Sequence, residues 1–161
     1  MPPLTFRPIT DEDLPFLRAL YGMTRADELA AVDWDDATRE AFLDQQFSAQ
    51  HAAYQATYRG AQFDMLLRDG VPVGRLYVMR WPREIRIVDI ALVPEARGQG
   101  LGTGLLQRLI AEAEAVGVPL GIHVEKFNPA LQLYLRLGFE IVADREVYWY
   151  MERPPGSSPV G

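Results

Sequence analysis

The chain has 161 residues, 48% of them hydrophobic, and a formal net charge of -6, which suits one domain with a real core. It has no cysteine, so disulfides, thiolate nucleophiles and cysteine-ligated zinc sites are excluded. The negative charge argues against nucleic-acid binding, and the lack of a signal pattern or an apolar run of ~18 residues argues against a membrane location, so we expect a cytoplasmic protein.

The N-terminal third is predicted to be a strand followed by helices. Residues 4–9 have a strand pattern, and Thr10 with the acidic residues 11–13 is typical of a helix start. Apolar spacing continues this helix to Tyr21, and a second helix begins near Asp35 or Asp36. An apolar stripe on the second helix is predicted to be core rather than a ligand cage. It comprises Leu43, Phe47, Tyr54 and Tyr58.

A hairpin and a central strand follow. Residues 63–68 and 73–79 alternate around Asp69-Gly70, a strong two-residue turn signal. Residues 85–93 form a β-branched run that ends at Pro94, which cannot donate to a strand ladder.

A glycine-rich turn and a helix come next. Gly98, Gly100 and Gly102 precede or open an amphipathic segment that reaches Ala113. The start of a helix presents unpaired N–H groups and partial positive charge, and glycine lets a ligand approach the backbone. This turn is therefore a candidate phosphate site. A Walker motif is excluded because no Gly-Lys-Ser/Thr follows.

The C-terminal part is predicted to be strand, short helix and two strands. Residues 120–125 alternate, with His123 and Glu125 opposite the apolar positions. Asn128 and Pro129 suit the cap and first position of a helix that ends at Gly138. Residues 139–143 and 147–151 are closing strands, and the strand before the glycine turn should run parallel to 120–125. We expect one domain over 1–153 and a flexible tail over 154–161.

Two segments carry a family resemblance. Residues 90–103, Ile-Ala-Leu-Val-Pro-Glu-Ala-Arg-Gly-Gln-Gly-Leu-Gly-Thr, resemble the acyl-CoA signature of the GNAT superfamily of N-acetyltransferases. Asn128-Pro129-Ala130 with Leu133-Tyr134 and Leu137-Gly138-Phe139 is similar to the superfamily's second signature. The resemblance implies an α/β fold. Its α+β mixed sheet would be twisted, splayed at its centre and flanked by about four helices.

By this resemblance, acetyl-CoA is the cosubstrate and the glycine turn binds its pyrophosphate. Main-chain groups of two strand residues would hold the pantetheine arm, Arg97 would add charge or pack the turn, and Asn128 would contact the arm as well as cap its helix. The implied CoA-binding residues are Leu92, Val93, Arg97, Gly98, Gln99, Gly100, Leu101, Gly102, Thr103 and Asn128.

The resemblance also implies direct attack of an amine on the thioester, with Tyr134 as general acid. A phenol of pKa ~10 can protonate a thiolate of pKa ~8.5, although a core tyrosine would show the same spacing. Asp89 is the first candidate base, with an ion pair to Arg86 or Arg75 as the alternative. His123 is the second candidate base. Glu125 shares its face, and Glu84 and Glu28 are candidates for binding a cationic substrate.

The acceptor is expected to be a small-molecule or peptide amine that binds near the first two helices. No acceptor signature is present, no metal is indicated by the two histidines, and a homodimer is plausible by resemblance alone. The competing hypotheses are a non-catalytic acyl-CoA-binding module or sensor and a nucleotide-binding domain of another type. Binding of acetyl-CoA and release of its thiol separate these classes.

Overall fold

The structure is a computed structural model in which residues 3–156 are described. The chain forms two compact units, Met1–Tyr77 with Asp89–Gln99, and Val78–Val88 with Gly100–Gly161. Two strands, β3 (Val71–Trp81) and β4 (Glu84–Leu92), contribute residues to both units. The strand order of the seven-stranded sheet is β1-β2-β3-β4-β5-β7-β6.

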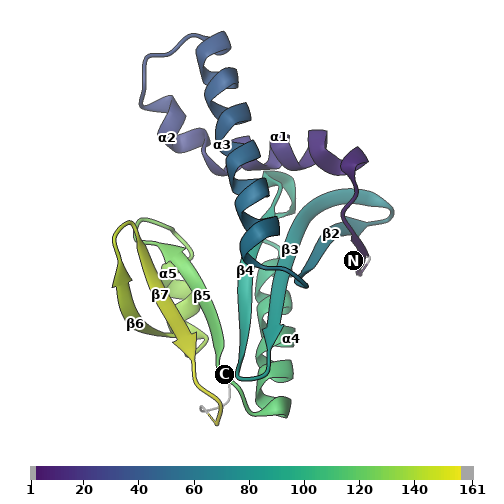
Figure 1. Cartoon of the computed structure of the whole chain (residues 1–161), viewed down its shortest axis with the longest axis vertical. Helices are drawn as coiled ribbons and strands as arrows, with labels where there is room; N and C mark the ends of the chain where they lie inside the picture. The colour runs from purple at the N-terminus through teal and green to yellow at the C-terminus, as the bar shows by residue number, and fades with distance from the viewer. Residues whose placement is uncertain (1–2, 157–161) are drawn as a thin grey trace. The chain divides into compact units, whose positions relative to one another are not determined.

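The first unit contains the helices α1 (Leu14–Thr24), α2 (Ala26–Ala30) and α3 (Asp36–Thr57), which are drawn together in Figure 1. Its strands β1 (Leu4–Pro8) and β2 (Gln62–Arg68) are antiparallel. The apolar faces of these elements form one buried cluster because the helical spacing places the apolar residues on one side. The cluster comprises Leu17, Tyr21, Leu29, Leu43, Phe47, Met65 and Leu67.

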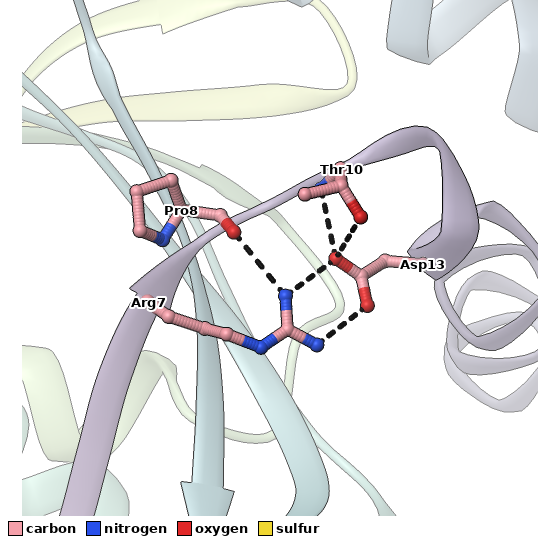
Figure 2. Close-up of polar contacts among 4 residues, drawn as sticks. All are labelled: Arg7, Pro8, Thr10 and Asp13. Carbon is pink, nitrogen blue, oxygen red and sulfur yellow. Dashed lines mark hydrogen bonds and ion pairs between the residues drawn. The ribbon is translucent and has the colours of Figure 1, made fainter.

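The entry to α1 is fixed by Asp13, whose side chain is almost buried (Figure 2). Its carboxylate accepts two hydrogen bonds of 2.8 Å from the Arg7 guanidinium and one of 2.8 Å from the Thr10 N–H. These bonds, above all those from Arg7, lower the pKa of Asp13 from 3.8 to about 2. The acidic helix start predicted from the sequence corresponds to the short 3-10 turn η1 (Asp11–Asp13). One of its acidic residues, Asp13, forms an ion pair with Arg7 that joins η1 to β1.

The second unit contains α4 (Leu101–Val116), β5 (Leu120–Glu125), α5 (Leu131–Arg136), β6 (Glu140–Arg145) and β7 (Tyr148–Arg153). β5 is parallel to β4, as predicted, and antiparallel to β7, which lies between β5 and β6 (Figure 1). One face of this part of the sheet is apolar and contributes Ile85, Ile87, Leu120, Ile122, Val124 and Met151 to the core. The opposite face carries the side chains of Arg86, His123, Tyr150 and Glu152.

Most predicted elements are confirmed. Asp35 caps α3 by accepting from the Thr38 N–H at 2.7 Å, and Asp69 and Gly70 form the turn between β2 and β3 with positive φ angles. The helix after Asn128 is shorter than predicted, beginning at Leu131. Asn128 therefore does not occupy the cap position; its Oδ1 accepts from the Ala130 N–H at 2.8 Å in the preceding turn.

Two predictions concern the ends and the exterior of the chain. The predicted tail lies mostly outside the described residues; its described part includes Gly156, whose N–H donates to Glu114. Within residues 3–156, none of the helices combines the length and the apolar character that a membrane span requires.

Candidate functional site

The glycine turn joins β4 to α4 through the 3-10 turn η2 (Pro94–Ala96) and residues 97–100. Gly100 has φ of 81°, a left-handed conformation that side chains rarely adopt. A Cβ at Gly100 would meet no described atom within 4 Å, so the backbone is open on that side. The Gly104 N–H bonds to the Gly100 carbonyl, and the N–H groups of residues 101–103 precede this first helical bond. These N–H groups can therefore bind an anion.

Side chains of the first unit hold the turn in shape. Gln99 donates from Nε2 to the Glu95 carbonyl at 2.7 Å and accepts from Arg68 at 2.9 Å. Arg97 donates from Nε to the Leu92 carbonyl at 3.0 Å, which is the turn-packing alternative considered for this residue. These bonds tie the side chains of Arg97 and Gln99 to the backbone of Leu92 and Glu95, which restrains the turn.

The two strand residues expected to bind pantetheine already use main-chain groups. The Val93 N–H donates to the Val73 carbonyl at 2.9 Å, and the Leu92 carbonyl accepts from Arg97. A carbonyl oxygen has two lone pairs, so Leu92 can accept a second hydrogen bond. Leu92 is thus better suited than the Val93 N–H to contact a ligand.

Tyr134 lies on α5 in the second unit, with 5% of its surface exposed. Its ring packs edge-on against Phe139 at a centroid distance of 5.6 Å. The Phe139 N–H donates to the Tyr134 carbonyl at 3.0 Å and closes the end of the helix. The ring is therefore held in one position, as both a core tyrosine and a general acid require.

Asp89 forms a polar cluster within the first unit. Its Oδ2 accepts from the Tyr54 hydroxyl at 2.9 Å and from Arg75 at 2.8 Å, and Arg75 also donates to Gln50 at 2.8 Å. The Arg75 side chain is only 3% exposed and its guanidinium lies 4.9 Å from the centroid of the Tyr77 ring. Of the two ion pairs considered for Asp89, the structure forms the one with Arg75.

Two tyrosines, Tyr77 and Tyr54, lie next to the ion pair of Arg75 and Asp89. Burial raises the pKa of the Tyr77 hydroxyl, while the neighbouring Arg75 opposes that change. Tyr54, which the sequence assigned to the core stripe, instead donates to a carboxylate 35 residues away in the chain. Its place three residues after His51 on an amphipathic helix gives no signal for this bond.

His123 belongs to the second unit and is half-buried. Its ring lies 4.8 Å from the Tyr150 ring and 6.4 Å from the Tyr148 ring, between centroids. Burial lowers the pKa of His123, and the positive charges of Arg86 and Arg145 lower it further. Asp89 thus lies in one unit, whereas His123, Asn128 and Tyr134 lie in the other.

The remaining acidic candidates have partners of their own. Glu28 pairs with Arg25 at 2.7 Å in the first unit. In the second unit, Glu84 pairs with Arg86 and contacts the Tyr150 hydroxyl at 3.1 Å. Tyr150 was missed by sequence reasoning because its place next to β5 depends on the strand order.

The glycine turn and the helix that follows it lie within a region that matches a known protein family. Residues 24–139 match the model of the acetyltransferase (GNAT) family. The chain belongs to the GNAT acetyltransferase family. The match spans both signature segments, so the resemblance that they indicated is confirmed, and the protein is an acetyltransferase.

Solved GNAT structures share the fold of the chain. PaiA N-acetyltransferase from Thermoplasma acidophilum, solved with coenzyme A, is 16% identical with a TM-score of 0.69, over 94% of this chain and 99% of that chain. A protein described as histone acetyltransferase HPA2 and related acetyltransferase, from Corynebacterium glutamicum ATCC 13032, is 23% identical with a TM-score of 0.66, over 99% and 100%. The ribosomal-protein-S18-alanine N-acetyltransferase from Escherichia coli is 25% identical with a TM-score of 0.60, over 98% and 97%.

Proposed function

We propose that the protein transfers an acetyl group from acetyl-CoA to a primary amine by direct attack in a ternary complex. The observation that carries the proposal is the open glycine backbone at the start of α4, a 16-residue helix whose first N–H groups can bind a pyrophosphate. Residues 1–153 would act as one catalytic domain, since the family match includes parts of both compact units.

The donor proposal rests on the turn and on a relative. Gly98 to Thr103 would bind the pyrophosphate of CoA, Leu92 and Val93 would line the pantetheine arm, and Asn128 would contact it. The Thermoplasma acidophilum relative was solved with coenzyme A, which supports the same donor class here.

In the reaction, the amine nitrogen forms a bond to the thioester carbonyl carbon as the carbon–sulfur bond breaks. Tyr134 would donate a proton to the departing CoA thiolate. A phenol is protonated at neutral pH, and its pKa of ~10 is only slightly above the ~8.5 of a thiol, so the transfer costs little. A base would remove a proton from the attacking amine.

We assign the base role to His123 rather than to Asp89. The Oδ2 atom of Asp89 already accepts from the Tyr54 hydroxyl at 2.9 Å and from the buried Arg75 at 2.8 Å, so this carboxylate serves the polar cluster. His123 has a pKa below its ordinary value of 6.5, so its imidazole is neutral and able to accept a proton at pH 7. Asp89 would then keep α3 and β4 in place through Tyr54 and Arg75.

The acceptor is proposed to be a small-molecule or peptide amine. The relative from Escherichia coli acetylates, by its name, an alanine of a ribosomal protein, so peptides with N-terminal alanine belong in the first panel. Polyamines, aminoglycosides and free amino acids test the small-molecule classes.

The test has two steps. Calorimetry with acetyl-CoA comes first, and thiol release from acetyl-CoA is then measured with each amine of the panel. We expect binding and amine-dependent thiol release. Binding without release for any amine would favour the acyl-CoA-binding module, and no binding at millimolar acetyl-CoA would contradict the proposal.

A further inference from the structure

We propose that Tyr150, Glu84 and Arg86 are positioning residues for His123: Glu84 and Arg86 anchor the hydroxyl of Tyr150, and the Tyr150 ring packs against the imidazole. A glycine at position 121 is the feature that leaves room for this arrangement. The inference rests on the proposed function, because it concerns the residue assigned there as the base. All of these residues belong to the second unit.

The Tyr150 ring is anchored through its hydroxyl. The hydroxyl accepts from Arg86 at 3.2 Å and lies 3.1 Å from Glu84 Oε2 and 3.0 Å from Glu152 Oε2. Burial raises the pKa of Tyr150, and the two carboxylates raise it further, so the phenol stays protonated and its one proton is shared between them. A tyrosine with 6% exposure and three polar partners at one end presents a fixed ring to His123.

Gly121 makes this position possible. It is the strand neighbour of Arg86 on β4 and of Glu152 on β7. A Cβ at Gly121 would lie 2.4 Å from the Tyr150 hydroxyl oxygen and 2.8 Å from Glu84 Oε2. Any larger residue at Gly121 must therefore displace the hydroxyl and the carboxylate that anchor the ring.

Two positively charged guanidinium groups lie against the Tyr150 ring. The Arg86 guanidinium lies 4.8 Å from its centroid and that of Arg145 lies 5.4 Å from it. A protonated His123 would be a third cation against the same ring, so the arrangement favours neutral imidazole. Glu84 opposes this effect by attracting the imidazolium.

The charged and titratable groups on the same face of the sheet as His123 come from four strands of its unit. β4 contributes an ion pair, β7 contributes two phenols and a carboxylate, β6 contributes a guanidinium, and β5 itself contributes a carboxylate. They are Glu84, Arg86, Tyr148, Tyr150, Glu152, Arg145 and Glu125.

The direct test is an NMR titration of the His123 imidazole in the full-length protein. The sequence has only two histidines, so the spectrum of His123→Gln assigns the signal. We expect Arg86→Gln to raise the His123 midpoint and Glu84→Gln to lower it, because one removes a positive and the other a negative neighbour. The matched control is Lys126→Gln, which removes a positive charge that pairs with Asp144 and should leave the midpoint unchanged.

A second variant keeps the test informative if Arg86→Gln does not fold. Arg145→Gln, on β6, should also raise the midpoint. Midpoints that stay fixed, or that move the same way for Arg86→Gln and Glu84→Gln, would overturn the inference.

The glycine requirement has its own test. Gly121→Ala should lower the thermal midpoint of unfolding, and its effect should be smaller in the Tyr150→Phe background, where the hydroxyl that it displaces is absent. An equal loss in both backgrounds would show that Gly121 does not serve Tyr150.

Kinetics separate this inference from the proposed function. If His123 is the base, the acidic limb of kcat/KM moves with the NMR midpoint, upward in Arg86→Gln and downward in Glu84→Gln. Opposite NMR shifts with an unmoved acidic limb would overturn His123 as the base, while its control by Glu84 and Arg86 would stand.

Discussion

The ion pair between Arg7 and Asp13 gives a prediction whose size follows from the structure (Figure 2). The pKa of Asp13 falls from 3.8 to about 2, and this difference corresponds to about 2.4 kcal/mol of preference for the charged form. The Arg7 side chain is 42% exposed, so solvent screening reduces the contribution to stability to roughly 1 kcal/mol. Asp13→Asn should lower the free energy of unfolding by that amount at pH 7.

The pH dependence fixes the sign. A carboxylate whose pKa is lowered in the folded state stabilises the fold above its unfolded pKa, and this stabilisation disappears as pH falls through the folded pKa. The difference between wild type and Asp13→Asn should therefore be full at pH 7, shrink below about pH 4 and vanish near pH 2.

Urea unfolding followed by far-UV circular dichroism at pH 7, 5, 4 and 3 measures this difference. Asp36→Asn is the matched control, because Asp36 pairs with Arg39 at 3.2 Å while its side chain is 99% exposed. We expect the control to change stability by less than ~0.5 kcal/mol. A difference for Asp13→Asn that is independent of pH, or no larger than that of Asp36→Asn, would refute the reasoning.

Three further predictions concern the proposed site. Tyr134→Phe should lower kcat while the calorimetric affinity for acetyl-CoA stays nearly unchanged; unchanged turnover would return Tyr134 to a core role alone. Gly100→Ala should weaken acetyl-CoA binding, whereas Gly60→Ala, with a similar φ of 85° outside the turn, should not, and equal affinities in calorimetry would contradict a ligand role for the turn. Asp89→Asn should lower the free energy of unfolding, measured by urea titration, by roughly 3 kcal/mol because it leaves Arg75 buried without a counter-ion. The control Glu28→Gln breaks an exposed ion pair and should cost at most ~1 kcal/mol. Equal losses in the two variants would show that burial of the ion pair does not increase its contribution to stability.

Most of the helices, strands and turns were predicted correctly because the signal for each one lies within a few adjacent residues. Asp35 is followed by a helical pattern and caps α3 in the structure, and Asp69-Gly70 forms the expected turn. The strand 120–125 was predicted from alternation alone and its bounds match β5. The short helix α2 was missed because five residues hold too few repeats to show a period.

The parts of the site that the sequence did not predict depend on contacts between distant segments. Tyr54 on α3 and Asp89 on β4 meet although 35 residues separate them in the chain, and nothing near either residue indicates the other. Tyr150 lies beside His123 because β7, and not β6, pairs with β5. A sequence pattern gives the two faces of a strand but not the identity of its neighbour, so the partner of His123 was out of reach.

Asp13 and His123 contribute to stability over different pH ranges, and this difference helps to separate loss of chemistry from unfolding. His123 has a folded pKa below 6.5, so between 6.5 and that value the unfolded state binds more protons and stability falls modestly as pH drops. The Asp13 contribution is lost only at lower pH, from about 4 downward. Below pH 6.5 the imidazole becomes protonated as the pH falls toward its lowered pKa, and above about pH 4 the contribution of Asp13 to the fold persists. An acidic limb that appears in this range with unchanged circular dichroism would therefore report loss of the base, and a limb that coincides with loss of ellipticity would report unfolding.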